Sequence, residues 1–175
     1  TAALSETVDW SHGFLGLTPD WYNADVSSVR VGVLDTGAAL THPDLRDAIV
    51  EAVDCTNSPS GPADVLGHGS WCLGAIGAVA NDIGVRGIAA GCKLYSFKVL
   101  NDQGWGTDDT IARGLELAID FDLDVISMSL GGPSMHPRIQ ELLHQFVTMK
   151  PRRFAFAAAG NDGKNTPVNF PGRWP

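Results

Sequence analysis

Four short apolar segments recur along the chain, each bounded by glycine, aspartate or asparagine. They span residues 29–34, 94–100, 125–130 and 154–159. Their apolar residues run continuously instead of alternating with polar ones, which is typical of strands covered on both faces. The pattern predicts four buried strands of a parallel sheet.

Three segments with helical spacing follow these strands, at residues 69–80, 107–121 and 137–149. Alternation of strands with helices favours an α/β fold, with a mostly parallel central sheet and helices on both faces. Nothing in the chain resembles a linker or an internal repeat, so residues 1–175 are expected to lie in one domain. Residues 169–175 resemble the approach to a further strand, and we expect that domain to be incomplete at its C-terminus.

Composition excludes several classes of partner. The chain has 175 residues, of which 44% are hydrophobic, and a net charge of -8. Nucleic acid and anionic membranes bind basic surfaces, which this composition does not supply. No apolar stretch approaches the roughly 20 residues of a membrane helix. We therefore expect neither nucleic acid nor a membrane as a partner.

Three residues with the chemistry of a hydrolytic site lie where apolar segments end or begin. Asp35 closes the first strand and precedes a Thr-Gly turn whose amides can keep a carboxylate ionised. His68 lies between two glycines at the start of a helix, where a ring can act as a base. Asn161 follows Ala-Ala-Ala-Gly, and its amide can donate to an oxyanion. Each of them alone could be structural, as a turn cap, an exposed ring or a turn residue.

In combination these motifs resemble those of the subtilisin-like serine proteases, the subtilases. Asp35 lies in Val-Leu-Asp-Thr-Gly and His68 in His-Gly-Ser-Trp-Cys-Leu-Gly, in the order that this family uses, and Asn161 matches the family's oxyanion asparagine. The resemblance covers residues 29–175 and implies a three-layer subtilisin-like fold. It also implies a serine endopeptidase that works by acyl transfer, and it favours secretion with an N-terminal prosegment.

The resemblance further implies how an extended polypeptide substrate would bind. Two segments would flank the peptide, and a third would line the pocket beside the scissile bond. The first two are Ser129, Leu130, Gly131 and Gly132 on one side and Gly104, Trp105 and Gly106 on the other; the third is Ala158, Ala159 and Gly160.

A structural calcium site is also implied by the resemblance. Asp44 would contribute a carboxylate, and a loop after the histidine helix would contribute further oxygens, which calcium prefers. That loop includes Val79, Asn81, Ile83 and Val85. A metal-free loop of the same shape is the alternative.

The family's third motif, Gly-Thr-Ser-x-Ala, is absent from these 175 residues, in which every serine precedes Pro137. We expect a parent protein that carries the serine further along, with a C-terminal remainder of the domain as partner, and no peptidase turnover from these residues alone. One alternative is a noncatalytic subtilase-like module that binds peptides. Another is an aspartic protease, because apolar-apolar-Asp-Thr-Gly is also the signature of that class.

Overall fold

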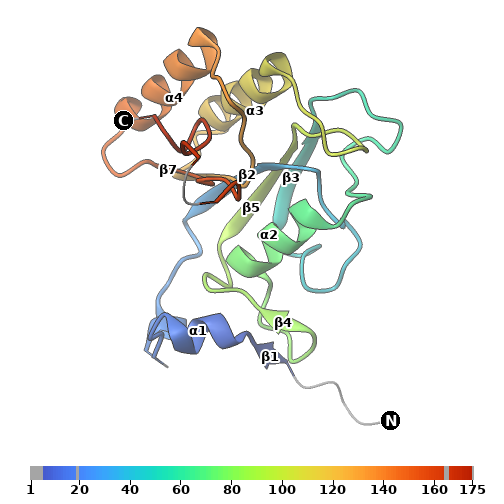
Figure 1. Cartoon of the computed structure of the whole chain (residues 1–175). Coiled ribbons are helices and arrows are strands. Elements are labelled where there is room, and N and C mark those ends of the chain that lie inside the picture. The colour runs from blue at the N-terminus through green and yellow to red at the C-terminus, as the bar shows by residue number, and fades with distance from the viewer. Residues whose placement is uncertain (1–5, 19, 164–165, 175) are drawn as a thin grey trace.

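A five-stranded sheet in which every pair of neighbours is parallel forms the centre of the computed structural model, which describes residues 6–18, 20–163 and 166–174. The strands lie in the order β3 (Ile49–Asp54), β5 (Lys93–Lys98), β2 (Arg30–Asp35), β6 (Val125–Met128) and β7 (Phe154–Ala157) (Figure 1). The α/β architecture with a parallel sheet is therefore confirmed. The central strand, β2, is the one that ends in Asp35.

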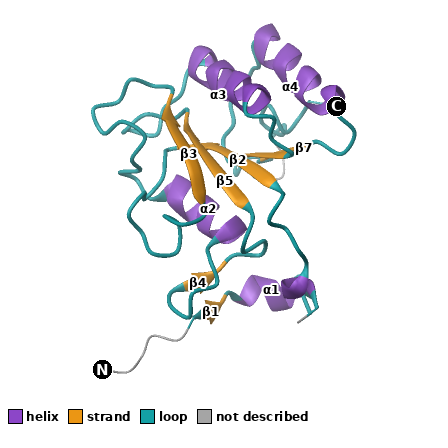
Figure 2. Ribbon diagram, turned by 180° about the vertical axis from the view of Figure 1, so that it is seen from behind, coloured by secondary structure: helices purple, strands orange, loops and turns teal. Residues whose placement is uncertain are grey.

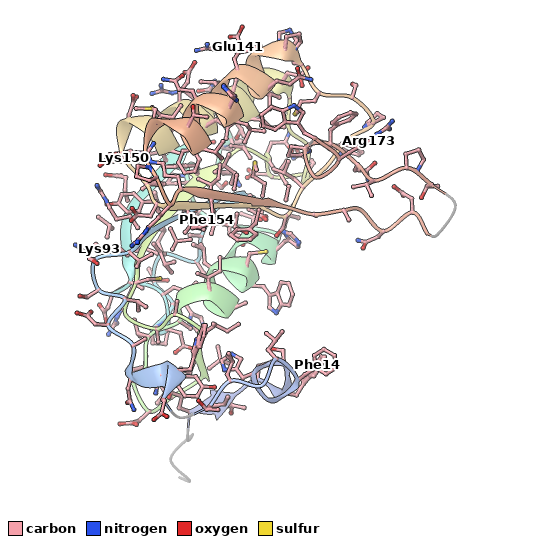
Figure 3. The ribbon with its side chains drawn as sticks, turned by 90° about the vertical axis from the view of Figure 1, so that its left-hand side faces the viewer. Phe14, Lys93, Glu141, Lys150, Phe154 and Arg173 are labelled. Atoms are coloured by element: carbon pink, nitrogen blue, oxygen red, sulfur yellow. The ribbon has the colours of Figure 1, made fainter. Side chains whose placement is uncertain are left out.

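Helices cover both faces of this sheet. Helix α2 (His68–Gly77) packs on one face, whereas α3 (Asp108–Asp120) and α4 (Pro137–Met149) pack together on the other (Figures 1 and 3). One core between the sheet and α3 and α4 contains Phe97 and Phe146, and a second core beneath α2 contains Leu73. The three-layer arrangement expected from the sequence is thus present.

Local sequence explains where the helices begin. The Thr107 hydroxyl accepts a hydrogen bond from the Thr110 amide and caps α3, and Pro137 occupies the first turn of α4. Helix α2 follows Gly67, whose φ of 89° is a left-handed conformation that glycine adopts readily. Within the described residues, no helix is both long and apolar enough to cross a membrane.

The sequence analysis missed β3 and the whole N-terminal region. Strand β3 lies at one edge of the sheet, and its partly exposed residues lack the continuous apolar run of the other strands. Near the N-terminus, β1 (Thr7–Val8) pairs with β4 (Val85–Arg86) in a separate two-stranded sheet, beside α1 (Trp10–Phe14) and a 3₁₀ turn at Trp21–Asn23 (Figure 2). Such short elements carry too little periodicity to be predicted.

Candidate active site

Asp35 is held rigidly where β2 ends. Its side chain is only 1% exposed, and its Oδ1 accepts the backbone N–H of Thr36 at 2.7 Å. Its backbone carbonyl accepts the N–H groups of Val99 and Leu100, at 2.9 and 3.1 Å. Its Oδ2, also buried, has no hydrogen-bond partner among the described residues. A buried carboxylate with an unsatisfied oxygen is typical of a functional acid, because purely structural groups are nearly always paired.

His68, the first residue of α2, contacts this acid directly. Its Nδ1 lies 2.7 Å from Asp35 Oδ1, and 48% of its side chain is exposed. Its other ring nitrogen, Nε2, makes no hydrogen bond to a described residue. An imidazole oriented by a carboxylate at one nitrogen and open at the other can act as a general base.

This pairing excludes the aspartic protease alternative. Enzymes of that class are β-rich and oppose two aspartates, whereas Asp35 faces an imidazole in a parallel α/β fold.

Asp64, which the sequence analysis missed, organises the start of α2. One carboxylate oxygen accepts the amide and hydroxyl of Ser70 at 2.8 and 2.6 Å. The other accepts the Thr36 hydroxyl and the Gly67 amide, each at 2.9 Å, and the Leu66 amide at 3.1 Å. Burial raises the pKa of Asp64, but the hydrogen bonds from Ser70, Gly67 and Thr36 outweigh it and lower this pKa overall. An aspartate four residues before the histidine, at a helix N-terminus, was the available signal.

Cys72 connects the acid and base to the predicted substrate strand. One ligand atom from each of Asp35, His68 and Cys72 lies within 4.8 Å of the other two. Burial raises the pKa of the Cys72 thiol to about 11, and the neighbouring Ser129 side chain works in the opposite direction. Ser129, the first residue after β6, therefore lies beside the acid–base pair.

The two predicted substrate-flanking segments line one cleft of about 640 Å³. Gly104, Trp105 and Gly106 line it together with residues 129–132. Leu66, two residues before His68, lies close enough to Gly104 that a Cβ there would be 3.4 Å from its Cδ1. The cleft therefore adjoins the loop that carries the base.

Within the cleft wall, Gly132 differs from its neighbours. Its amide and carbonyl both pair with Phe170, at 3.0 and 2.9 Å, so they are not free for a peptide. By contrast, the backbone groups of Leu130 and Gly131 make no hydrogen bond to another described residue. Phe170 also lines the cleft, and the sequence analysis did not select it.

The third predicted segment, Ala158 to Gly160, and Asn161 lie after β7 and outside the lining of this cleft. Gly160 has a φ of 97°, and a Cβ there would lie 2.5 Å from Asn169 Nδ2. Asn161 is exposed, and its side chain makes no hydrogen bond to any residue that the structure describes. Its amide is therefore available as a donor, although nothing joins it to His68.

The residues expected to hold calcium do converge. The backbone carbonyl of Asp44 accepts the Val79 amide at 2.9 Å, and its Oδ2 accepts the Val85 amide at 2.9 Å. Asn81 Nδ2 lies 3.4 Å from Asp44 Oδ1, and Asn81 Oδ1 accepts the Ile83 amide at 3.1 Å.

Two further residues contact this loop closely. Glu6, which the sequence analysis missed, adds a second carboxylate, because its Oε1 accepts the Asn81 amide at 2.9 Å. Gly84 packs directly against the Asp44 carboxylate, because a Cβ at this position would lie 2.2 Å from Asp44 Oδ2. Carboxylates and a side-chain amide oxygen are ligands of the kind that calcium prefers.

Comparison with known proteins gave consistent matches. Residues 27–175 match the model of the subtilase family. The chain is 36% identical over 160 residues to an intracellular serine protease of Paenibacillus polymyxa. This alignment covers 87% of the present chain and 48% of the protease. It is 38% identical over 143 residues to subtilisin DY of Bacillus licheniformis, covering 82% and 51% respectively. Thermitase of Thermoactinomyces vulgaris is 34% identical over 152 residues, covering 86% and 53%. The chain thus spans about half the length of these relatives.

Proposed function

The chain belongs to the subtilase family, and on that basis we propose that it contributes the acid, the base and an oxyanion donor to a serine endopeptidase. The observation that carries this proposal is the 2.7 Å hydrogen bond between His68 Nδ1 and the buried Asp35 carboxylate. No serine of these 175 residues is assigned as nucleophile. The nucleophilic serine comes from the remainder of the parent protein.

In this proposal, His68 Nε2 removes the proton of that serine while its oxygen attacks the scissile carbonyl. Asp35 keeps the ring in the required tautomer and stabilises the imidazolium that forms. Asn161 donates its amide to the tetrahedral oxyanion, a contact whose loss costs about 10²- to 10³-fold in turnover in the enzyme where it has been measured. His68 then returns the proton to the leaving amine.

The substrate in this proposal is an extended polypeptide in the cleft between residues 104–106 and 129–132. The free backbone groups of Leu130 and Gly131 support this, because main-chain pairing holds extended peptides without regard to most side chains. Ala158, Ala159 and Gly160 would line the pocket next to the scissile bond.

The test uses the natural full-length protein and a fluorophosphonate probe, which phosphonylates the oxygen of an activated serine with loss of fluoride. We expect labelling of one serine outside residues 1–175, and loss of labelling in His68→Ala and Asp35→Ala. The 175-residue chain alone is expected to remain unlabelled and to show no peptidase turnover. Peptide binding without labelling or turnover in the full-length protein would instead support the noncatalytic, peptide-binding alternative.

We also propose that the loop around Asp44 holds a structural calcium ion. The ligands are the side chains of Asp44, Asn81 and Glu6, with carbonyls of Val79, Ile83 and Val85. Calcium bound only to the folded state raises the free energy of unfolding as its concentration exceeds Kd. We therefore expect calcium to raise the Tm and EGTA to lower it, with Asp44→Asn insensitive to both. An equal response of Asp44→Asn would place the ion elsewhere.

A further inference from the structure

Lys98 is a charged residue with no role in the proposed chemistry, yet it is completely buried. It is the last residue of β5 and 0% exposed. Its register partner on β2 is Asp35 itself. Burying an ammonium group is costly unless each of its protons is paired, so the partners of Lys98 reveal what it holds together.

Three oxygens surround the ammonium group. Lys98 Nζ donates to the carbonyl of Thr36 at 2.6 Å and to the carbonyl of Ala63 at 3.1 Å. It also forms an ion pair with Asp102 Oδ1 at 3.1 Å. Asp102 in turn accepts the Ser60 hydroxyl at 2.5 Å.

Each of these partners belongs to a different part of the site. Thr36 follows the acid, donates its amide to Asp35 Oδ1, and accepts the Gly69 amide of α2 on its hydroxyl at 2.9 Å. Ala63 precedes Asp64, which organises the start of α2. Asp102 lies in the turn closed by the hydrogen bond of 2.8 Å from Asn101 N to Trp105 O, next to the substrate-flanking glycines.

We propose that Lys98 is a positioning residue that fixes the acid, the base-bearing helix and the substrate-flanking turn relative to one another. The backbone of Thr36 is held on both sides, because its amide donates to Asp35 Oδ1 and its carbonyl accepts from Lys98 Nζ. Loss of the hydrogen bond from Lys98 Nζ to the Thr36 carbonyl lets Thr36 move. The start of α2, which carries His68, moves with it because the Gly69 amide donates to the Thr36 hydroxyl. The proposal rests on the proposed function for its catalytic consequence, but its geometric consequence is independent of it.

A purely structural lysine is the competing explanation. It predicts that removing the ammonium lowers stability alone, in the same way as any other core substitution. The positioning role predicts a split between two variants: loss of the ammonium changes kcat, because acid and base are misplaced, whereas loss of the Asp102 charge chiefly changes KM, because the substrate-flanking turn is loosened.

The experiment compares Lys98→Met, Lys98→Arg, Asp102→Asn and Leu142→Ala in the natural full-length protein. Leu142, buried on α4 and outside the cleft lining, serves as the control for a loss of core stability. Lys98→Met is expected to lower kcat between about ten- and hundredfold, the range that a misplacement of about 1 Å can cost. Lys98→Arg is expected to restore most of kcat, Asp102→Asn to raise KM several-fold, and Leu142→Ala to change neither.

A second measurement does not require turnover. The deshielded proton NMR resonance of the His68 Nδ1–H reports its hydrogen bond to Asp35. We expect it to be lost or shifted in folded Lys98→Met and kept in Lys98→Arg and Leu142→Ala. If the wild-type protein shows no turnover, the proposed function fails and this resonance still decides the inference.

The inference is overturned if Lys98→Met keeps both kcat and the His68 resonance, or if Leu142→Ala loses them equally. Should Lys98→Met not fold, Asp102→Asn decides: an unchanged KM together with an unchanged His68 resonance overturns the proposal.

Discussion

At the scale of single residues, the site depends on carboxylates that receive backbone amides. Asp35 orients His68, and Asp64 gathers the amides and hydroxyls that fix the helix on which His68 lies. Thr36 links the two acids, because its amide donates to Asp35 and its hydroxyl donates to Asp64. The placement of the base therefore also depends on Asp64 and Thr36, which take no part in the proposed chemistry.

Replacing Asp64 should show this dependence. Asp64→Ala leaves the Ser70, Gly67 and Thr36 donors without their acceptor, and we expect it to lower the free energy of unfolding by about 1–3 kcal/mol. Urea unfolding measures this loss. Because the pKa of Asp64 is lower in the folded protein than the usual value of about 3.9, its stabilisation is present above that value and is lost as the pH falls through the folded pKa.

Asp64→Asn, which cannot ionise, should therefore lose less stability than wild type between about pH 5 and pH 2. An equally steep acid decline in Asp64→Asn would show that other carboxylates cause it.

The three cysteines should be unreactive in the folded chain. Burial raises the pKa of Cys55, Cys72 and Cys92 to about 11 in each case. At pH 8 a thiol with that pKa is ionised to about one part in 1000, and the thiolate is the reactive form. Ellman's reagent should therefore label the three thiols slowly in the folded chain and promptly in guanidinium chloride. Fast labelling of folded Cys72→Ser would identify Cys55 or Cys92 as accessible.

At the scale of elements, the sequence best predicted the buried strands and the helices with one apolar face. The sequence predicted four strands and three helices within a few residues, namely β2, β5, β6, β7, α2, α3 and α4. Continuous apolar runs and helical spacing of apolar residues are direct consequences of burial. Strand β3 was missed because an edge strand with exposed residues has no continuous apolar run. Glu6 and Lys98 were missed because their contacts join segments far apart in the sequence, whereas Asp64 was missed although most of its partners are within six residues of it.

The start of α2 gives a sharp test at this scale. A Cβ at Gly69 would lie 2.3 Å from the Gly37 carbonyl oxygen, so Gly69→Ala must push α2 away from the turn after Asp35. We expect it to lower the free energy of unfolding by about 1–3 kcal/mol and to disturb the His68–Asp35 hydrogen bond.

Gly74→Ala is the matched control on the same helix, because a Cβ there meets nothing within 4 Å. It should stabilise the chain by about 0.5–1 kcal/mol, as alanine replaces glycine in a helix. Thermal unfolding of both variants provides the comparison. If Gly69→Ala and Gly74→Ala changed the Tm equally, the close approach of α2 to Gly37 would be refuted.

At the scale of the whole molecule, one side of the sheet is covered less completely than the other. On the edge strand β7, Ala155 and Ala157 pack toward the core beneath α3 and α4, whereas the alternate residues Phe154 and Phe156 are 53% and 61% exposed. Figure 3 labels Phe154 on this strand. Successive side chains of a strand point to opposite faces, so both phenylalanines lie on the side of the sheet that carries α2.

This face should make the 175-residue chain associate with itself. Exposed apolar edge strands are recurrent sites of aggregation. We expect concentration-dependent sedimentation and binding of a hydrophobic dye, both reduced in the double variant Phe154→Ser, Phe156→Ser. Phe14→Ser removes an exposed phenylalanine from α1 instead and is the control. A monomer that binds no dye at high concentration would contradict the expectation.

The order of the strands also has a consequence in time. The central strand β2 pairs with β5 and β6, which follow it only after long intervening segments, and the edge strand β3 is the next strand of the sheet along the chain. Folding slows as native pairing becomes less local, because the ends of long loops must meet before contacts compensate for the lost entropy. Helix α2, which carries His68, packs on both β2 and β5, so we expect the acid and the base to be held together only once β5 has paired with β2.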